Sequence, residues 1–173
     1  MVTDVQDKTA AARAGKAADP GAEERAITAL INRAARLVDD QKFMEWMELF
    51  TEDGVYSAIT RENAASSGLY LFRDVGHRML HMRVAFLMGL WQVPRGATTH
   101  LVSNLEIEVL DAETATCVSN FILARTGELE MTKLHASGRY YDRFQKVDGA
   151  WRFKARDVVV DTSILPSEST DLL

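Results

Sequence analysis

The sequence predicts an α+β domain in which three N-terminal helices pack on a curved, mainly antiparallel β-sheet. Apolar residues recur at helical spacing in the first half of the chain, whereas from Ala97 onward they alternate as in strands. The segment Lys42–Ile59 changes from the first period to the second and therefore predicts a corner. Each predicted helix has one apolar stripe, so the helices must cover one face of the sheet. A curved sheet closed by helices in this way forms a cone with a pocket.

The first predicted helix begins at Asp19-Pro20, because aspartate caps helices and proline suits their first turn. A short amphipathic helix follows over Phe43–Phe50, and Thr51–Gly54 ends it, since glycine can adopt the positive φ of a helix exit. Val55–Ile59 then predicts a strand. The core-facing residues of the first helix recur at steps of three and four: Ile27, Leu30, Ile31, Ala34, Leu37 and Val38.

The third predicted helix spans Val75–Trp91 and follows a polar segment, Thr60–Gly68, that predicts a loop. Asp74 is its expected N-cap, and Pro94-Arg95-Gly96 ends it. The residues expected to face the core share one side of this helix: Val75, Met79, Met82, Phe86 and Leu90.

Four strands are predicted in the second half of the chain. The last two are joined by Asp148-Gly149, a strong hairpin turn signal. In the last strand, Trp151, Phe153 and Ala155 are expected to face the core, with the basic residues between them on a solvated face. The predicted strands are Ala97–Val109, Ala115–Thr126, Met131–Phe144 and a final strand from Trp151 to Thr162.

The chain of 173 residues suits one domain, and its 47% hydrophobic and 26% charged residues are normal for a globular protein. Residues 1–18 contain no large apolar residue after Val5 and predict a flexible N-terminal arm. Residues 19–165 form the expected domain. Residues 166–173 form a C-terminal tail that ends in two leucines and either docks on a neighbour or frays.

Charge and composition exclude several classes of function. The net charge of −5 argues against nucleic-acid binding. No apolar run approaches the roughly 18 residues that a membrane span needs, and the N-terminus lacks the apolar core of a signal peptide. The single cysteine, Cys117, excludes an internal disulfide and leads us to expect a cytoplasmic protein. A Rieske cluster needs two cysteines and two histidines, so this chain cannot hold one.

Asp74, His77 and His81 are candidates for a metal site. The two histidines are four residues apart on a predicted helix, and with the carboxylate they could form a two-histidine, one-carboxylate iron site. The alternative is that both histidines lie on the exposed side of the helix or at a subunit contact. The alternative is favoured, because such spacing often occurs by chance.

His100 and His135 lie in predicted strands and could face the pocket, with Tyr56 and Asp53 near its rim. A His–Asp or Tyr–His pair there could serve as a general acid and base for a dehydratase or isomerase. The favoured alternative is that these histidines are structural, because the sequence alone shows no pairing. Cys117 is expected to be a small core residue. The row Arg152, Lys154 and Arg156 is expected to be solvated or to meet an acidic partner.

Five segments of the sequence, taken together and in order, carry a family resemblance. The segments are Leu37–Tyr56 (LVDDQKFMEWMELFTEDGVY), Thr98–Asn104 (TTHLVSN), Val118–Phe121 (VSNF), Gly138–Asp142 (GRYYD) and Trp151–Asp161 (WRFKARDVVVD). They resemble, in the same order, segments of the small (beta) subunits of aromatic-ring-hydroxylating dioxygenases, and the resemblance covers about residues 25–162. It implies the cone-shaped fold that these subunits share with nuclear transport factor 2 and scytalone dehydratase.

The resemblance implies a subunit without an active site of its own, so no catalytic, cofactor-binding or metal-binding residue is assigned. In this family the large (alpha) subunit carries the Rieske [2Fe–2S] cluster and a mononuclear Fe(II). Electrons reach it from NADH through a reductase, and the complex adds dioxygen to an aromatic ring. The small subunits form a trimer within a complex of three large and three small chains. Thr60–Asn63 (TREN) is similar to small subunits that serve aromatic acids.

Two other functions stay open: a stand-alone dehydratase or isomerase of the same fold, and a module that binds a small ligand. The enzyme requires a buried cluster of Tyr56 with His100 or His135, whereas the small subunit requires a cone plugged by its own side chains. For the small subunit, partner contacts are expected at two faces. These faces are Asn104, Glu106 and Glu108, and Arg152, Lys154 and Arg156.

Overall fold

The computed structural model describes residues 21–89, 96–162 and 173, and it confirms the predicted α+β class. Within these residues, no helix is long and apolar enough to cross a membrane. The predicted arm, and the predicted tail except for Leu173, lie outside the described residues. The elements in chain order are α1 (Ala22–Asp39), α2 (Phe43–Met47), β1 (Phe50–Thr60), α3 (Arg61–Ala65), β2 (Phe72–Val75), α4 (Gly76–Gly89), β3 (Ala97–Val109), β4 (Thr114–Thr126), β5 (Lys133–Val147) and β6 (Ala150–Val160).

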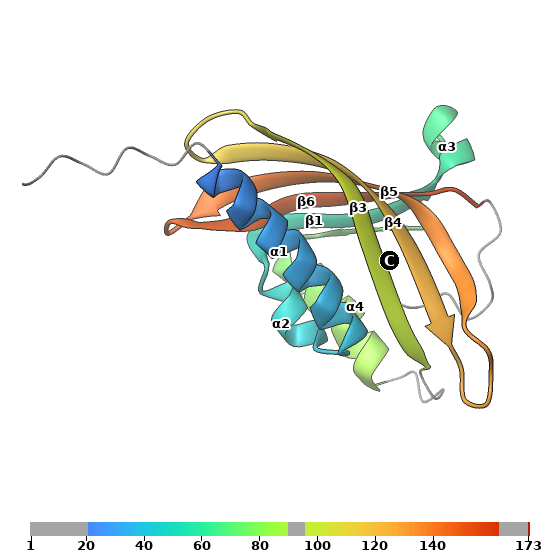
Figure 1. Cartoon of the computed structure of the whole chain (residues 1–173). Coiled ribbons are helices and arrows are strands. Elements are labelled where there is room, and N and C mark those ends of the chain that lie inside the picture. The colour runs from blue at the N-terminus through green and yellow to red at the C-terminus, as the bar shows by residue number, and fades with distance from the viewer. Residues whose placement is uncertain (1–20, 90–95, 163–172) are drawn as a thin grey trace, which may run out of the picture.

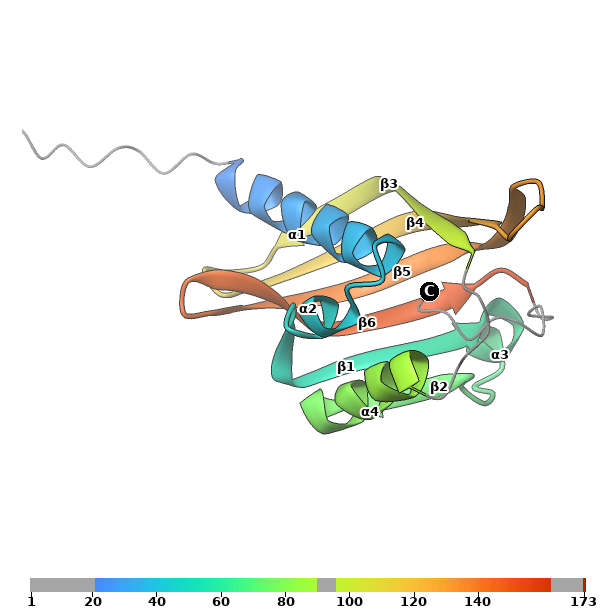
Figure 2. The same cartoon turned by 90° about the horizontal axis from the view of Figure 1, so that it is seen from below.

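The strands form one curved six-stranded sheet in the order β2-β1-β6-β5-β4-β3. All neighbouring strands are antiparallel except β1 and β6, which are parallel. The helices α1, α2 and α4 cover one face of this sheet (Figure 1). Seen from below, α1 crosses the β3 side and α4 lies over β1 and β2 (Figure 2). The predicted arrangement of helices on a curved, mainly antiparallel sheet is therefore confirmed.

The corner at the start of β1 is built from aromatic residues. Trp46 of α2 packs edge-on against Phe50 and Tyr56, at 4.8 and 5.0 Å between ring centroids. The strand begins at Phe50 rather than at Val55, and its pairing with β6 is irregular between these residues. Gly54 is required in this irregular stretch, because a Cβ there would lie 2.8 Å from the backbone oxygen of Thr51.

Three bulges curve the sheet. In β3, Asn104 has φ 53° and the pairing skips between Ser103 and Glu106. His135 is the extra residue in β5 and Lys154 the extra residue in β6. Each bulge bends its strand and reverses the side to which the following residues point.

The bulge at Lys154 corrects the prediction for the basic row of the last strand. Arg156 follows the bulge and is buried, with only 3% of its surface exposed, so its expected place on a solvated face or at a partner contact is wrong. Leu101 precedes the bulge in β3 and is exposed, whereas Leu105 and Ile107 beyond it pack against the core. A pattern in which every second residue faces the core cannot describe a strand in which a bulge exchanges the inward and outward sides.

The third predicted helix is present as α4, but the face that it turns toward the core differs from the predicted one. Gly76, with φ 78°, starts α4, so Asp74 and Val75 belong to β2, and Asp74 is no helix cap. Antiparallel pairing of Val75 with Val55 sets where the helix leaves the sheet. The helix consequently buries Leu80, Val84 and Leu87, whereas the expected core residues Val75, Met79, Met82 and Phe86 are exposed. The remaining one, Leu90, lies outside the described residues.

Two short elements were not predicted. Part of the expected loop Thr60–Gly68 forms α3, which Thr60 caps by accepting a hydrogen bond from the backbone of Asn63 at 3.2 Å. The other is β2, on the edge of the sheet. The predicted hairpin turn is present, with positive φ at both Asp148 (51°) and Gly149 (78°).

Candidate functional site

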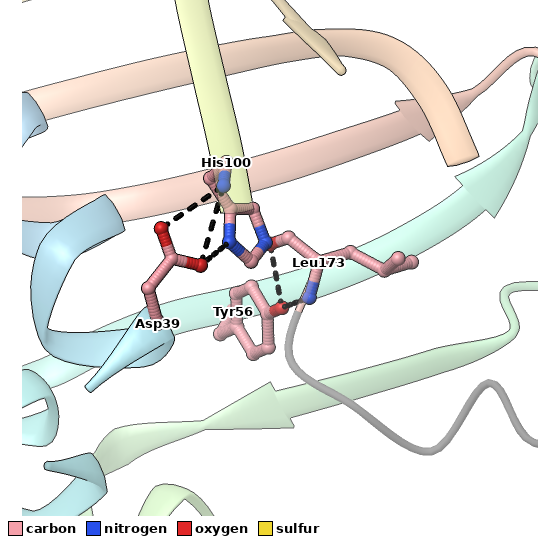
Figure 3. Close-up of polar contacts among 4 residues, drawn as sticks. All are labelled: Asp39, Tyr56, His100 and Leu173. Carbon is pink, nitrogen blue, oxygen red and sulfur yellow. Dashed lines mark hydrogen bonds and ion pairs between the residues drawn. The ribbon is translucent and has the colours of Figure 1, made fainter. Parts of the chain in front are cut away.

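Asp39 and His100 form a hydrogen-bonded pair inside the cone. Asp39 is the last residue of α1, and His100 lies on β3, the strand beside that helix. The His100 Nδ1 atom is 2.6 Å from Oδ1 of Asp39, and the His100 backbone N–H donates to Oδ2 at 3.0 Å (Figure 3). The His100 side chain is only 3% exposed. The carboxylate therefore fixes both the position and the rotation of the imidazole ring.

This pairing decides which ring nitrogen is available for chemistry. Burial opposes the charge of Asp39, but hydrogen bonds from the His100 side chain and backbone outweigh it and lower the pKa of Asp39. The carboxylate is thus ionised at neutral pH and accepts a hydrogen bond from Nδ1–H. The other nitrogen, Nε2, is buried and has no hydrogen-bond partner among the described residues.

Tyr56 brings a hydroxyl group to the same interior. It is fully buried, and burial raises its pKa to about 12, so the hydroxyl stays protonated. This hydroxyl donates to the main-chain oxygen of Leu173 at 2.9 Å and accepts from the Leu173 N–H at 2.8 Å. Figure 3 shows the His100 ring and the Tyr56 hydroxyl directed toward the main chain of Leu173. The cluster therefore joins α1, β1, β3 and Leu173.

A second buried pair, Arg156 and Asp142, neutralises itself. Arg156 donates two hydrogen bonds to the carboxylate, at 2.8 and 2.7 Å, and its guanidinium lies over the rings of Tyr140 and Phe153. Burial alone would lower the pKa of Arg156, but the Asp142 carboxylate raises it above its ordinary value. We assign this pair a structural role, because its two charges satisfy each other.

The expected metal candidates do not form one cluster. Asp74 is ion-paired with Arg83. His77 places Nε2 3.2 Å from the backbone oxygen of Phe50 and Nδ1 3.6 Å from the Glu52 carboxylate, whereas His81 is exposed. In the described part of the chain, no three His, Cys, Asp or Glu side chains are placed to hold a metal ion.

The other candidates fall into two groups. Tyr56 and His100 lie in the interior, as the acid–base hypothesis required, but Asp53 is on the surface in an ion pair with Lys154. His135 is the extra residue of the β5 bulge. Cys117 is buried as expected, and burial raises its pKa to about 11.

Asp39 was not among the sequence-predicted site residues. It begins the polar run Asp39-Asp40-Gln41, which follows the apolar stripe of the first helix. A weak signal was available, since Asp39 directly follows the core residues Leu37 and Val38 of the apolar stripe. A carboxylate next to such a stripe at a helix end can reach the interior.

Among the exposed apolar residues on the described part of the chain, two groups lie on regular elements and concern partner contacts. One is the outer face of α4 with the end of β2, which we name the α4 face: Val75, Met79, Met82 and Phe86. The other is on the sheet, where Leu101 and Ile122 are neighbours on β3 and β4. Exposed contiguous apolar surface on a folded chain often marks an interface.

The comparisons with known proteins place this geometry in a family. A model of the SnoaL-like domain matches residues 21–157. The chain belongs to the SnoaL-like domain family. This SnoaL-like chain is 28% identical over 138 residues to the anthranilate 1,2-dioxygenase small subunit of Burkholderia cepacia. That match covers 79% of the chain and 86% of the relative, and it confirms the resemblance that the sequence segments predict.

Solved structures with the same fold include two proteins from Novosphingobium aromaticivorans. One is assigned as the beta subunit of an aromatic-ring-hydroxylating dioxygenase, with a TM-score of 0.76, 23% identity and coverage of 87% of this chain and 97% of the other. The other is assigned as a scytalone dehydratase, with a TM-score of 0.64, 22% identity and coverage of 81% and 85%. At these identities the SnoaL-like chain shares the fold with both.

Proposed function

We propose that this SnoaL-like chain is the non-catalytic small subunit of an aromatic-ring-hydroxylating dioxygenase and supports assembly of its iron-containing large subunit. The observation that carries the proposal is the similarity to a dioxygenase small subunit over most of both chains. The complex acts in the cytoplasm in the degradation of aromatic compounds, with an aromatic acid as the substrate class.

The redox centres of the proposed complex belong to the large subunit. That chain holds the Rieske [2Fe–2S] cluster and the mononuclear Fe(II), and a reductase delivers electrons from NADH. The sequence of the small subunit supports this division, because one cysteine cannot supply the thiolate ligands of a Rieske cluster.

The proposed complex contains three large and three small chains, with the small chains associated as a trimer. The α4 face supplies apolar surface suited to such contacts. No acidic residue occurs between Val75 and Gly89, whereas Arg78 is exposed on α4. Exposed Glu106 and Glu108 on β3 carry the opposite charge, which favours contacts between basic and acidic surfaces of partner chains.

Co-expression with candidate large subunits tests the assembly role. The expected result is a complex whose mass by light scattering equals three large and three small chains. Its iron and Rieske absorption should appear only when the large chain is present. Large subunits expressed alone are the control. A SnoaL-like chain that never co-purifies with any large subunit from an aromatic-acid dioxygenase would contradict the proposal.

One observation favours a second function, a stand-alone dehydratase or isomerase. The Asp39–His100 pair holds a base in the cone, and a scytalone dehydratase-type structure shares the fold. This function requires turnover by the isolated chain. A screen of hydroxylated and keto aromatic compounds with the isolated chain and with a His100→Phe variant separates it from the assembly role, which requires no turnover.

A further inference from the structure

We propose that the turn between β4 and β5 docks on the α4 face of a second copy of this chain. The docking residues of this turn, which we name the hairpin tip, are Glu128, Leu129, Glu130 and Met131. The inference rests on the proposed small-subunit function and deepens it, because it names the two surfaces through which the small chains associate.

The hairpin tip presents large apolar side chains to solvent. Leu129 is fully exposed, and Met131 is 84% exposed. The base of the turn is closed by a hydrogen bond of 2.9 Å between the hydroxyl groups of Thr126 and Thr132. Apolar side chains that an ordered turn holds at the end of a hairpin are suited to insertion into the surface of a partner.

Leu129 runs against two local preferences of its position. The N–H of Glu130 donates to the carbonyl of Gly127 at 3.3 Å and closes the turn, and Leu129 has φ 59° within it. Glycine and asparagine are the usual residues at positive φ, and exposed turns are usually polar. A leucine at this position therefore weakens the isolated turn. A contact that covers its side chain in an assembly accounts for its presence.

The charges around Leu129 define the partner surface. Glutamates flank it on both sides, and Glu130 is ion-paired with Lys133 at 2.9 Å, whereas Glu128 is exposed. An anionic lipid surface repels such an acidic turn, so the chemistry favours a protein partner. That partner surface should be apolar, should carry a basic residue and should have no acidic residue opposite Glu128.

The α4 face has this chemistry. Its exposed residues are apolar, no acidic residue occurs between Val75 and Gly89, and the exposed Arg78 lies four residues from Met82 on the same side of the helix. Methionine side chains adapt their shape to an inserted group. Glu106 and Glu108 on β3 are also acidic and exposed, but their strand neighbours on β4 are half-buried, so that surface lacks a projecting apolar group.

The proposed contact joins two different surfaces of the chain. Figure 2 shows the hairpin between β4 and β5 at one end of the sheet, whereas α4 lies over β1 and β2 on the other side. The tip of one chain therefore docks on the α4 face of the next chain, and each chain uses both surfaces. Head-to-tail contacts of this kind generate a closed ring when the rotation between neighbours closes, and three chains form the proposed trimer.

Light scattering of the isolated full chain over a concentration series tests the contact. We expect Leu129→Asn to weaken self-association by about tenfold, because the apolar side chain is lost. Asparagine tolerates positive φ, so this variant keeps the turn, and circular dichroism checks the fold. Leu110→Asn is the matched control, because Leu110 is an exposed leucine outside the hairpin tip. Its mass should equal that of the natural chain.

A charge exchange tests whether the two surfaces meet. Glu128→Arg and Arg78→Glu should each weaken self-association, because each places like charges opposite one another. The double variant with both changes should recover most of the natural association. A double variant that is weaker than either single variant would show that Glu128 does not face Arg78.

Cross-linking establishes the direction of the contact. A short bismaleimide should join a Glu128→Cys chain to an Arg78→Cys chain in a mixture and should join neither variant to itself. The natural chain is the control, because its only cysteine, Cys117, is buried. Cross-linking of Glu128→Cys to itself would show that two tips meet, which would overturn the head-to-tail contact.

Three further results would overturn the inference. The first is a natural chain that stays monomeric at every concentration, and the second is a Leu129→Asn variant that associates as the natural chain does. The third is a Leu129→Asn variant that keeps its self-association but loses the large subunit in co-expression, because the tip would then belong to that contact. The proposed function fails by a different result, a natural chain that never co-purifies with a large subunit.

Discussion

At the scale of single residues, Asp39 makes the free energy of unfolding depend on pH in the acidic range. Hydrogen bonds with His100 hold its folded pKa below the ordinary value of 3.8. Its stabilisation is therefore complete above the unfolded pKa and is lost as the pH falls below 3.8 through the folded pKa. We expect the free energy of unfolding of Asp39→Asn to fall less steeply than that of the natural chain in this range.

Urea unfolding at a series of acidic pH values measures this slope. Asp40→Asn is the matched control, because the neighbouring Asp40 side chain is 52% exposed and lies 3.8 Å from the Lys42 ammonium in a surface ion pair. Equal slopes for Asp39→Asn and the natural chain would show that the His100 pairing contributes no acid-dependent stability.

The Arg156–Asp142 pair predicts a large cost for removing one partner. Both side chains are buried, so Arg156→Met leaves an uncompensated carboxylate in the interior. We expect a loss of about 3–5 kcal/mol in the free energy of unfolding, measured with urea. The double variant Arg156→Met with Asp142→Leu should recover most of that loss, because it removes both charges. A double variant as unstable as the single one would mean that packing, not charge, sets the cost.

The sequence alone supported part of the site. Tyr56 and His100 were recognised because they are polar residues within strand patterns. The partner of His100 was not recognised, since Asp39 is 61 positions away and meets it only when α1 packs along β3. Leu173 was expected in a tail, and nothing in the residue types indicates that its main chain reaches Tyr56. Pairings over such separations depend on tertiary packing.

At the scale of elements, α4 offers a direct test of which face is buried. Leu80 is fully buried and Met82 is 55% exposed, although the sequence pattern placed Met82 in the core. We expect Leu80→Ala to lower the free energy of unfolding by about 2–5 kcal/mol. Met82→Ala should change it by no more than about 0.5 kcal/mol. Thermal and urea unfolding of the isolated chain measure both losses. A larger loss for Met82→Ala than for Leu80→Ala would show that the face predicted from the sequence is the buried one.

The sequence predicted whether each long element is a helix or a strand, but it did not predict which residues of that element face the core along its whole length. Periodicity identified the regions of α1, α2 and β3 to β6 because each has a sustained pattern. The bulges at Asn104, His135 and Lys154 carry no glycine or proline, so no composition signal marks the change of phase. The short elements β2 and α3, of four and five residues, are too brief for a periodic signal.

At the scale of the whole molecule, the α4 face predicts self-association. Val75, Met79, Met82 and Phe86 expose apolar surface that a trimer contact would cover. We expect Met82→Asp to lower the mass of the isolated chain in light scattering while circular dichroism stays unchanged. Ala64→Asp, at an exposed position on α3, is the matched control. If the natural chain and the Met82→Asp variant have the same mass in solution, the α4 face takes no part in self-association.

The fold class followed from the order of patterns, helices first and strands later, whereas the strand order did not. Hairpin signals predict that neighbours in sequence pair, as β5 and β6 do. The parallel pairing of β1 with β6 joins segments from opposite halves of the chain and has no local signal. Only the packing of the complete sheet selects it.

The same pairing governs when the domain can fold during synthesis. β1 sits between β2 and β6, so its inner edge stays open until the last strand has left the ribosome. Until then, the apolar residues of α1, α2 and β1 have no complete sheet to cover. The nascent chain therefore exposes the apolar residues of its N-terminal half for most of its translation, which favours aggregation until β6 is available.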